Sequence, residues 1–182
     1  MPAALPRTER YSTVAILFHW TIAFFVIVNL IVGIGHDYVP AMRAWMPGHK
    51  AIGILVLALT LARVAWRMIH RPPPLPAYVA GAHRAAAHAM HWALYALLVL
   101  MPLTGWMMVS GPEKRRPLTF FGAFDIPYLP VSSGGADAGH SGHGLLGWAM
   151  VILVVIHIAA ALRHHLVLRN GVLLRMAPIL GR

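Results

Sequence analysis

Four long apolar stretches, separated by shorter polar connections, dominate the pattern of residues along this chain. A helix needs about 20 mostly apolar residues to cross a bilayer core that is about 30 Å thick. Each stretch is long enough and contains no Asp or Glu, so each predicts a membrane-spanning helix at residues 13–35, 49–69, 87–110 and 143–168. The pattern therefore predicts an all-α membrane protein, a four-transmembrane-helix bundle formed as a single domain by residues 1–182.

The segments between these spans have the composition of turns and loops. The proline run in HRPPPLPAY should end the second span and stiffen the turn that follows it. The longest connection is predicted over residues 111–142, where SSGGADAGHSGHG is typical of a flexible loop. The first apolar stretch follows a short polar segment without a small-residue cleavage site, so we expect a retained helix rather than a removed signal peptide.

Composition supports the membrane assignment and excludes several other classes. The chain is 59% hydrophobic and 11% charged, whereas a soluble domain has about a quarter of its residues charged. The formal net charge of +10 is scattered between apolar blocks, which argues against nucleic-acid binding and for loops that contact membrane lipid. The absence of cysteine excludes disulfides, iron–sulfur clusters and covalently attached c-type haem.

The distribution of basic residues predicts which side of the membrane each connection occupies. Cytoplasmic loops carry an excess of Lys and Arg. One side would carry ten of these residues: Arg7, Arg10, Arg63, Arg67, Arg71, Arg84, Arg163, Arg169, Arg175 and Arg182. The other side would carry five: Arg43, Lys50, Lys114, Arg115 and Arg116. We therefore expect both termini to be cytoplasmic.

Histidines at matching depths are the main candidates for a functional site. His143 and His157 lie fourteen positions apart in the fourth span, which corresponds to about 21 Å along a helix and a difference of about 40° around it. Both should therefore point in the same direction at two depths. When the direction of each span is followed, His49 matches His143 near the outer side, and His19 matches His157 near the inner side.

Two imidazoles at each depth suit haem b, because an iron porphyrin accepts one axial imidazole on each face and its apolar edge fits a bundle interior. Zinc normally takes three or four protein ligands, often including Cys or a carboxylate, and the spans contain neither. The predicted iron ligands are the pairs His49/His143 and His19/His157, which hold two non-covalent haems per chain. Small residues near them, such as Gly48, Gly53, Gly142, Gly144 and Gly147, could leave space for the macrocycle or allow close helix packing.

Several other histidines compete with this assignment. His91 lies on the same side as His19 and is also followed by Trp, so it is the main alternative ligand. His88 and His91 lie three residues apart on one helical face and could instead contact haem propionates or a quinone carbonyl. His140 competes in the same way with His143, although it falls in the predicted loop. His164 and Arg71 are further candidates for contacts with a quinone headgroup or with propionates at the cytoplasmic side.

The chain resembles the prokaryotic cytochrome b561 family over nearly its whole length. The segments that carry the resemblance are RYSTVAILFHW, GHKAIGILVLALTLARVAWR, HWALYALLVLMPLTGW and HGLLGWAMVILVVIHIAAALRHHLVLRNGVLLRMAP. The resemblance implies a small diheme cytochrome of the bacterial inner membrane whose axial ligands are His19, His49, His143 and His157. It also implies electron transfer to ubiquinone and, for some members, a superoxide:quinone oxidoreductase activity with superoxide as the periplasmic donor.

Three functions remain open at this point. The first is a stand-alone cytochrome that passes electrons from a periplasmic donor, such as superoxide, to ubiquinone. The second is an anchor subunit that receives electrons from a partner dehydrogenase, because the chain has no flavin or nicotinamide motif of its own. The third is a non-redox transporter that uses histidines as relay groups. The sequence also leaves a homo-oligomer open.

Overall fold

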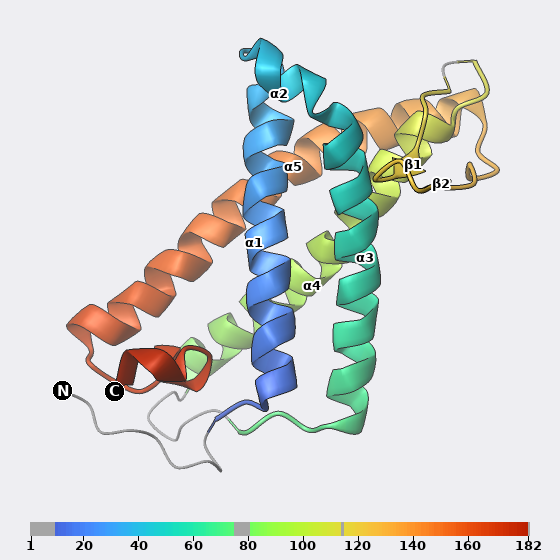
Figure 1. Ribbon diagram of the computed structural model, residues 1–182. Coiled ribbons are helices and arrows are strands. Elements are labelled where there is room, and N and C mark those ends of the chain that lie inside the picture. The colour runs from blue at the N-terminus through green and yellow to red at the C-terminus, as the bar shows by residue number, and fades with distance from the viewer. Residues whose placement is uncertain (1–9, 75–80, 114, 182) are drawn as a thin grey trace.

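The computed structural model describes residues 10–74, 81–113 and 115–181. Four long helices run up and down the molecule: α1 (Thr13–Gly35), α3 (Met46–Ile69), α4 (Gly81–Ser110) and α5 (Ser133–Leu162) (Figure 1). A short helix, α2 (Pro40–Ala44), joins α1 to α3. The segment that connects α4 to α5 contains an antiparallel hairpin of β1 (Thr119–Phe120) and β2 (Phe124–Asp125). All four long helices are long and apolar enough to cross a membrane, which confirms the predicted fold class.

Different segments of the chain lie at the two ends of the bundle. The beginnings of α1 and α4 and the ends of α3 and α5 lie at one end, here called the terminal end (Figure 1). The chain after α5 returns to α1 there, because Tyr11 N donates to Arg175 O at 3.4 Å and Trp20 Nε1 donates to Met176 O at 2.8 Å. The opposite end, here called the hairpin end, contains α2, the β1–β2 hairpin and the beginning of α5. Three basic residues in the charge count, Arg7, Lys114 and Arg182, lie outside the described residues.

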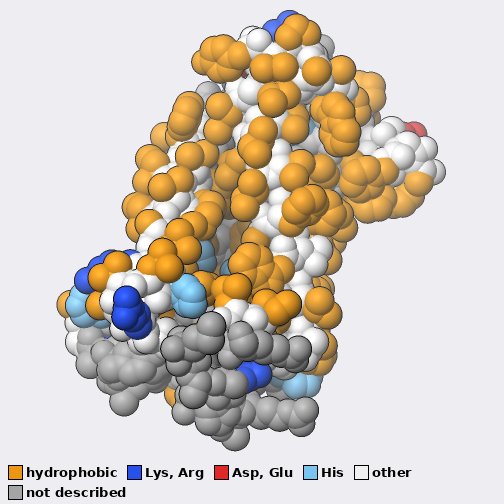
Figure 2. Space-filling view, turned by 60° about the vertical axis from the view of Figure 1, so that its left-hand side comes forward, with side chains coloured by type: hydrophobic (Ala, Val, Ile, Leu, Met, Phe, Trp, Pro, Cys, Tyr) orange, Lys and Arg blue, Asp and Glu red, His pale blue; other side chains and the backbone are white. Residues whose placement is uncertain are grey.

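Apolar side chains divide between a small core and the faces that would meet lipid. The core brings together buried residues from all four long helices: Ile22, Ile52, Val56, Leu97, Leu98 and Met150. On α1 an exposed stripe follows the helical repeat, with Leu17, Trp20, Phe24, Ile27 and Ile31 all on one face. Figure 2 shows hydrophobic side chains covering the sides of the bundle along its length. Such a surface is stable when lipid, rather than water, surrounds it.

The beginning of α5 differs from the sequence prediction. Residues 133–142 were expected to be part of a flexible loop, but α5 begins at Ser133, and Ser132 caps it by accepting a hydrogen bond from Gly135 N at 3.2 Å. Helix α4 packs closely against this glycine-rich turn. An added Cβ at Gly139 would lie 2.9 Å from Met107 Cβ and 3.0 Å from the backbone of α4. The glycines here allow close packing of two helices and do not mark a loop.

The other helix boundaries differ from the predicted spans by smaller amounts. Helix α1 covers residues 13–35, α3 begins three residues before the predicted position and α4 begins six residues before it. Helix α5 ends at Leu162 and is continued by a π-helical turn at Arg163–Val167, so the helical span ends one residue before the predicted position. That turn widens the helix just before the chain folds back toward α1.

The close α4–α5 contact leads to a stability prediction. Gly139→Ala should lower the free energy of unfolding by roughly 1–3 kcal/mol, because the new methyl group overpacks against the backbone of α4. Gly144→Ala is the matched control, since no atom lies within 4 Å of its added Cβ and both variants gain the same helix propensity. Thermal unfolding in detergent measures the difference. Equal midpoints for the two variants would contradict the packing described here.

Candidate functional site

His49 and His143 face each other near the hairpin end. His49 lies in the first turns of α3 and His143 lies in α5, and the centres of their rings are 6.2 Å apart with an angle of 85° between the ring planes. Two imidazoles that bind one metal ion, each with a bond of about 2 Å and a ring nitrogen about 1.1 Å from the ring centre, have ring centres about 6 Å apart. The observed separation therefore fits one metal ion between the two rings.

Hydrogen bonds orient both of these rings. His49 Nδ1 lies 3.2 Å from Asn29 O on α1, and His143 Nδ1 lies 3.0 Å from Met101 O on α4. A carbonyl oxygen only accepts, so Nδ1 must carry the proton in both rings. The lone pair of each neutral imidazole is then on Nε2. This is the arrangement that metal-binding histidines usually have, with the second nitrogen held by a backbone or carboxylate oxygen.

Three histidines meet near the terminal end. The ring centre of His157 on α5 lies 6.3 Å from that of His19 on α1 and 5.9 Å from that of His91 on α4. Both separations suit a shared metal ion, so distance alone does not choose between the two partners. Within the described chain, the ring nitrogens of these three histidines form no hydrogen bond. Arg63 on α3 lies within electrostatic range of all three.

The kind of metal site is limited by the number of ligands. Among the described residues, no group of three or more His, Asp or Glu side chains is arranged to hold a metal ion by itself. A facing pair of imidazoles can therefore supply only the two opposite ligands of a cofactor that brings its other ligands with it. An iron porphyrin meets this condition, since its four equatorial nitrogens belong to the macrocycle. The residues present thus fit haem b.

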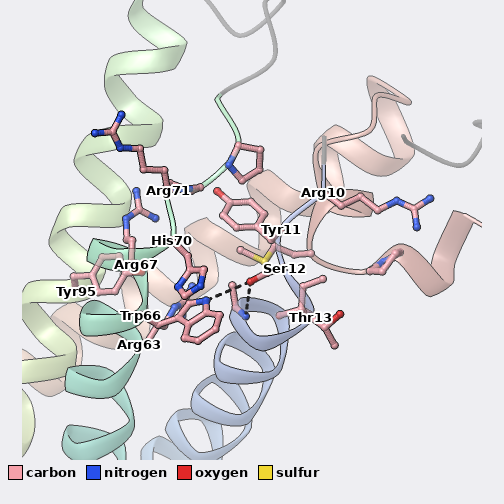
Figure 3. Close-up of a pocket in the computed structure, with 16 residues that line it drawn as sticks. Arg10, Tyr11, Ser12, Thr13, Arg63, Trp66, Arg67, His70, Arg71 and Tyr95 are labelled. Atoms are coloured by element: carbon pink, nitrogen blue, oxygen red, sulfur yellow. Dashed lines mark hydrogen bonds between the residues drawn. The ribbon is translucent and has the colours of Figure 1, made fainter. Parts of the chain in front are cut away.

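A cavity of about 720 Å³ opens at the terminal end between α1, α3 and the chain after α5 (Figure 3). Four arginines line it, Arg63, Arg67 and Arg71 from one face of α3 and its extension, and Arg10 from the segment before α1. The ring of Tyr95 lies beneath two of them, 5.4 Å from the guanidinium carbon of Arg63 and 6.0 Å from that of Arg67. The stacked rings of Trp66 and His70, 3.7 Å apart, form an aromatic wall.

Among the described residues, no carboxylate lines this cavity to balance its positive charge. All four carboxylates in the described part of the chain, Asp37, Glu113, Asp125 and Asp137, belong to the hairpin end. The cavity therefore favours an anionic group, or a polar headgroup that accepts hydrogen bonds. Regular spacing of Arg63, Arg67 and Arg71 by four residues was a signal in the sequence that could have located this site.

The remaining predicted site residues fall in different places. Arg71 lines the cavity. His164 does not line it, because it lies in the π-helical turn, where Asn170 Nδ2 donates to its Nδ1 at 2.9 Å. His140 lies in α5 and not in a loop, with its Nδ1 3.1 Å from the sulfur of Met108. His88 lies on α4, one turn before His91.

Sequence reasoning missed the residues that hold the rings at the hairpin end. It associated the small residues beside each histidine, such as Gly48 and Gly53, with space at the site. The glycines that contact the rings come instead from neighbouring helices, Gly33 on α1 and Gly105 on α4. Neither these contacts nor the carbonyl acceptors have a sequence signal, because backbone oxygens are present at every position.

Facing histidine pairs in a bundle of bilayer-length helices are typical of membrane cytochromes, and they indicate that class of protein here. The chain belongs to the prokaryotic cytochrome b561 family, whose model matches residues 10–178. Members of this family are membrane cytochromes with b-type haem that function in electron transport.

Three relatives are similar over nearly their full length. Cytochrome b561 homolog 2 of Escherichia coli (strain K12) is 36% identical over 92% of this chain and 91% of its own length. The protein named probable superoxide oxidase CybB of Yersinia pestis is 27% identical over 93% and 97%. Cytochrome b562 of Cereibacter sphaeroides is 26% identical over 94% and 98%. Because this family consists of membrane cytochromes, the family assignment argues against the hypothesis of a non-redox transporter.

Proposed function

We propose that this chain binds two b haems and carries electrons across the bacterial inner membrane, from a donor at the hairpin end to ubiquinone at the terminal end. The observation that carries the proposal is the presence of facing imidazoles at two depths, with ring centres 6.2 Å apart at one depth and 6.3 Å at the other. The pairs His49/His143 and His19/His157 are the proposed axial ligands. Their separation along α5 is about 21 Å, which would divide the path across the bilayer into two steps.

The bound haems would supply reversible one-electron chemistry, and the residues of the chain would bind the haems and exclude water. The pair His49/His143 would hold the iron of one haem, and the pair His19/His157 would hold the iron of the other. The apolar core around Ile22, Ile52 and Met150 keeps water away from the path between the two depths. Low polarity around the sites limits the solvent rearrangement that accompanies each electron transfer.

The distribution of charge supports a hairpin end that faces the periplasm. The terminal end carries eight described basic residues: Arg10, Arg63, Arg67, Arg71, Arg84, Arg163, Arg169 and Arg175. The hairpin end carries four: Arg43, Lys50, Arg115 and Arg116. An excess of Lys and Arg is typical of the cytoplasmic side. The chain segments before α1 and after α5 would then both be cytoplasmic.

Superoxide is the proposed donor. Lys50 follows the ligand candidate His49 directly, and its Nζ donates to Pro117 O, which places a cation beside the hairpin-end pair. Such a cation would attract a small anion. The relative from Yersinia pestis is named as a probable superoxide oxidase. Two superoxide anions would each lose one electron to give O2, and one ubiquinone would take up two electrons and two protons to give ubiquinol.

The arginine-lined cavity is the proposed place of quinone reduction or of propionate binding. Arg71 lines this cavity, and Arg63, which also lines it, lies within electrostatic range of the terminal-end histidines. Arg63 and Arg67 are therefore suited to haem propionates, and the region of Arg71 and the stacked rings of Trp66 and His70 is suited to a quinone headgroup. His164 is the second candidate for a headgroup contact, although Asn170 already occupies its Nδ1.

The ligand assignment predicts haem content directly. Purified wild-type protein should contain two non-covalent b haems per chain, and His49→Ala and His157→Ala should each lose a different one. Removal of one axial imidazole leaves the iron with a single protein ligand, so binding weakens strongly. Haem extraction with protein quantification measures the count, and reduced-minus-oxidised spectra identify which haem remains. A wild-type protein without haem would contradict the proposal.

The competition at the terminal end has its own test. His19→Ala should remove the same haem as His157→Ala, whereas His91→Ala should keep two haems, because in this assignment His91 lies beside the site without binding the iron. Spectra of the three variants, recorded at equal protein concentration, make the comparison. Loss of that haem in His91→Ala, with retention in His19→Ala, would reverse the pairing.

The activity of the isolated chain separates a stand-alone enzyme from an anchor subunit. With a superoxide source, the purified protein alone should reduce ubiquinone, and the rate should fall as ionic strength rises because an anion is attracted by cations. Lys50→Gln should lower the rate and its dependence on salt, while haem content stays at two. If quinone reduction requires an added dehydrogenase and superoxide gives none, the chain is an anchor subunit.

A further inference from the structure

The two histidines at the hairpin end are held by the same local arrangement on two different helices. On α1, Asn29 O accepts from His49 Nδ1 at 3.2 Å, and Gly33 follows four residues later. On α4, Met101 O accepts from His143 Nδ1 at 3.0 Å, and Gly105 follows four residues later. In an α-helix the carbonyl of residue i points along the axis toward residue i+4. A ring that reaches this carbonyl must therefore pass over residue i+4.

Glycine at residue i+4 is what makes this approach possible. A Cβ added at Gly33 would lie 2.9 Å from His49 Cε1, and a Cβ added at Gly105 would lie 3.0 Å from His143 Cε1. Carbon atoms in contact normally stay about 3.5–4.0 Å apart. An alanine at either position would push the ring outward and lengthen a hydrogen bond that is already 3.0–3.2 Å long. The carbonyl and the glycine together form what is here called an imidazole seat.

Neighbouring side chains reinforce each imidazole seat. Asn29 Nδ2 also donates to His49 O at 3.1 Å, which fixes the first turn of α3 against α1. Thr104 Oγ1 lies 3.3 Å from His143 Nδ1 and is itself held by Leu100 O at 2.8 Å. The terminal-end histidines lack comparable hydrogen bonds among the described residues. Among the described residues, hydrogen bonds therefore orient the imidazoles at the hairpin end but not those at the terminal end.

We infer that the imidazole seats Asn29–Gly33 and Met101–Gly105 position His49 and His143 and lower the reduction potential of the haem that these two histidines bind. The inference rests on the proposed function. A hydrogen bond from Nδ1–H to a carbonyl makes an imidazole a stronger electron donor to its metal. Stronger donation stabilises ferric relative to ferrous iron. The seats therefore favour electron transfer from the hairpin-end haem toward the terminal-end haem, and Gly33 and Gly105 are positioning residues.

Two glycine variants and two matched controls test this inference. Gly33→Ala and Gly105→Ala should keep two haems per chain but shift the potential of one haem upward, and this haem should be the one lost in His49→Ala. The second haem should keep its potential and serves as an internal reference. The controls Gly134→Ala and Gly135→Ala lie in the first turn of α5, away from the histidine pairs, where an added Cβ has no neighbour closer than 3.5 Å, so neither haem should shift.

Spectroelectrochemistry of the haem-loaded protein measures both potentials at once. The inference is overturned if both potentials stay unchanged in Gly33→Ala and Gly105→Ala, or if the controls shift them equally, since the glycines would then serve helix packing only. If the alanine variants do not fold, Thr104→Val removes one polar contact of His143 without a change in volume and should raise the same potential. An unchanged potential in Thr104→Val would then count against the inference. A wild-type protein without two haems would instead refute the proposed function.

Discussion

A buried imidazole in a lipid-surrounded bundle is stabilised by hydrogen-bond partners, and this requirement governs how the helices meet at the hairpin end. No water is available in the bilayer core, so an unpaired polar group there costs several kcal/mol. Carboxylates, which could pair with histidine, are absent from the apolar spans. The rings at the hairpin end therefore donate from one nitrogen to backbone carbonyls, and the lone pair of the other nitrogen stays available. The helices must approach each other closely enough to offer those carbonyls.

Close approach explains the distribution of glycine. Helix α5 lies against α4 through Gly139, and α3 lies against α1 where Gly33 faces His49. In the first case the missing side chain lets two helix backbones lie close together, and in the second it lets a ring reach a carbonyl oxygen. Elsewhere the buried core is small, and many large apolar side chains are exposed. Packing between helices thus depends on a few close contacts, whereas lipid covers the remaining apolar surface.

Much of this architecture was predictable from the sequence, because bilayer thickness sets the length of a span and helical geometry sets the direction of a side chain. The four spans and the shared direction of His143 and His157 follow from these rules. The beginning of α5 could not be predicted in this way, since a segment rich in glycine and serine is typical both of a flexible loop and of a helix that packs closely against another. The choice between His19 and His91 also could not be made, because both lie beside His157 and only tertiary packing brings them together.

Helix α5 contributes one imidazole to each of the two depths, and it is continuous from Ser133 to Leu162. A rigid-body rotation or translation of α5 would therefore move both imidazoles together. Such a movement cannot adjust one of the two proposed cofactor sites alone. The opposite side of each proposed site is built from α1, α3 and α4, which contribute separately. Movements of those three helices can change the geometry of one proposed site without the other, and α5 serves as the common reference of both.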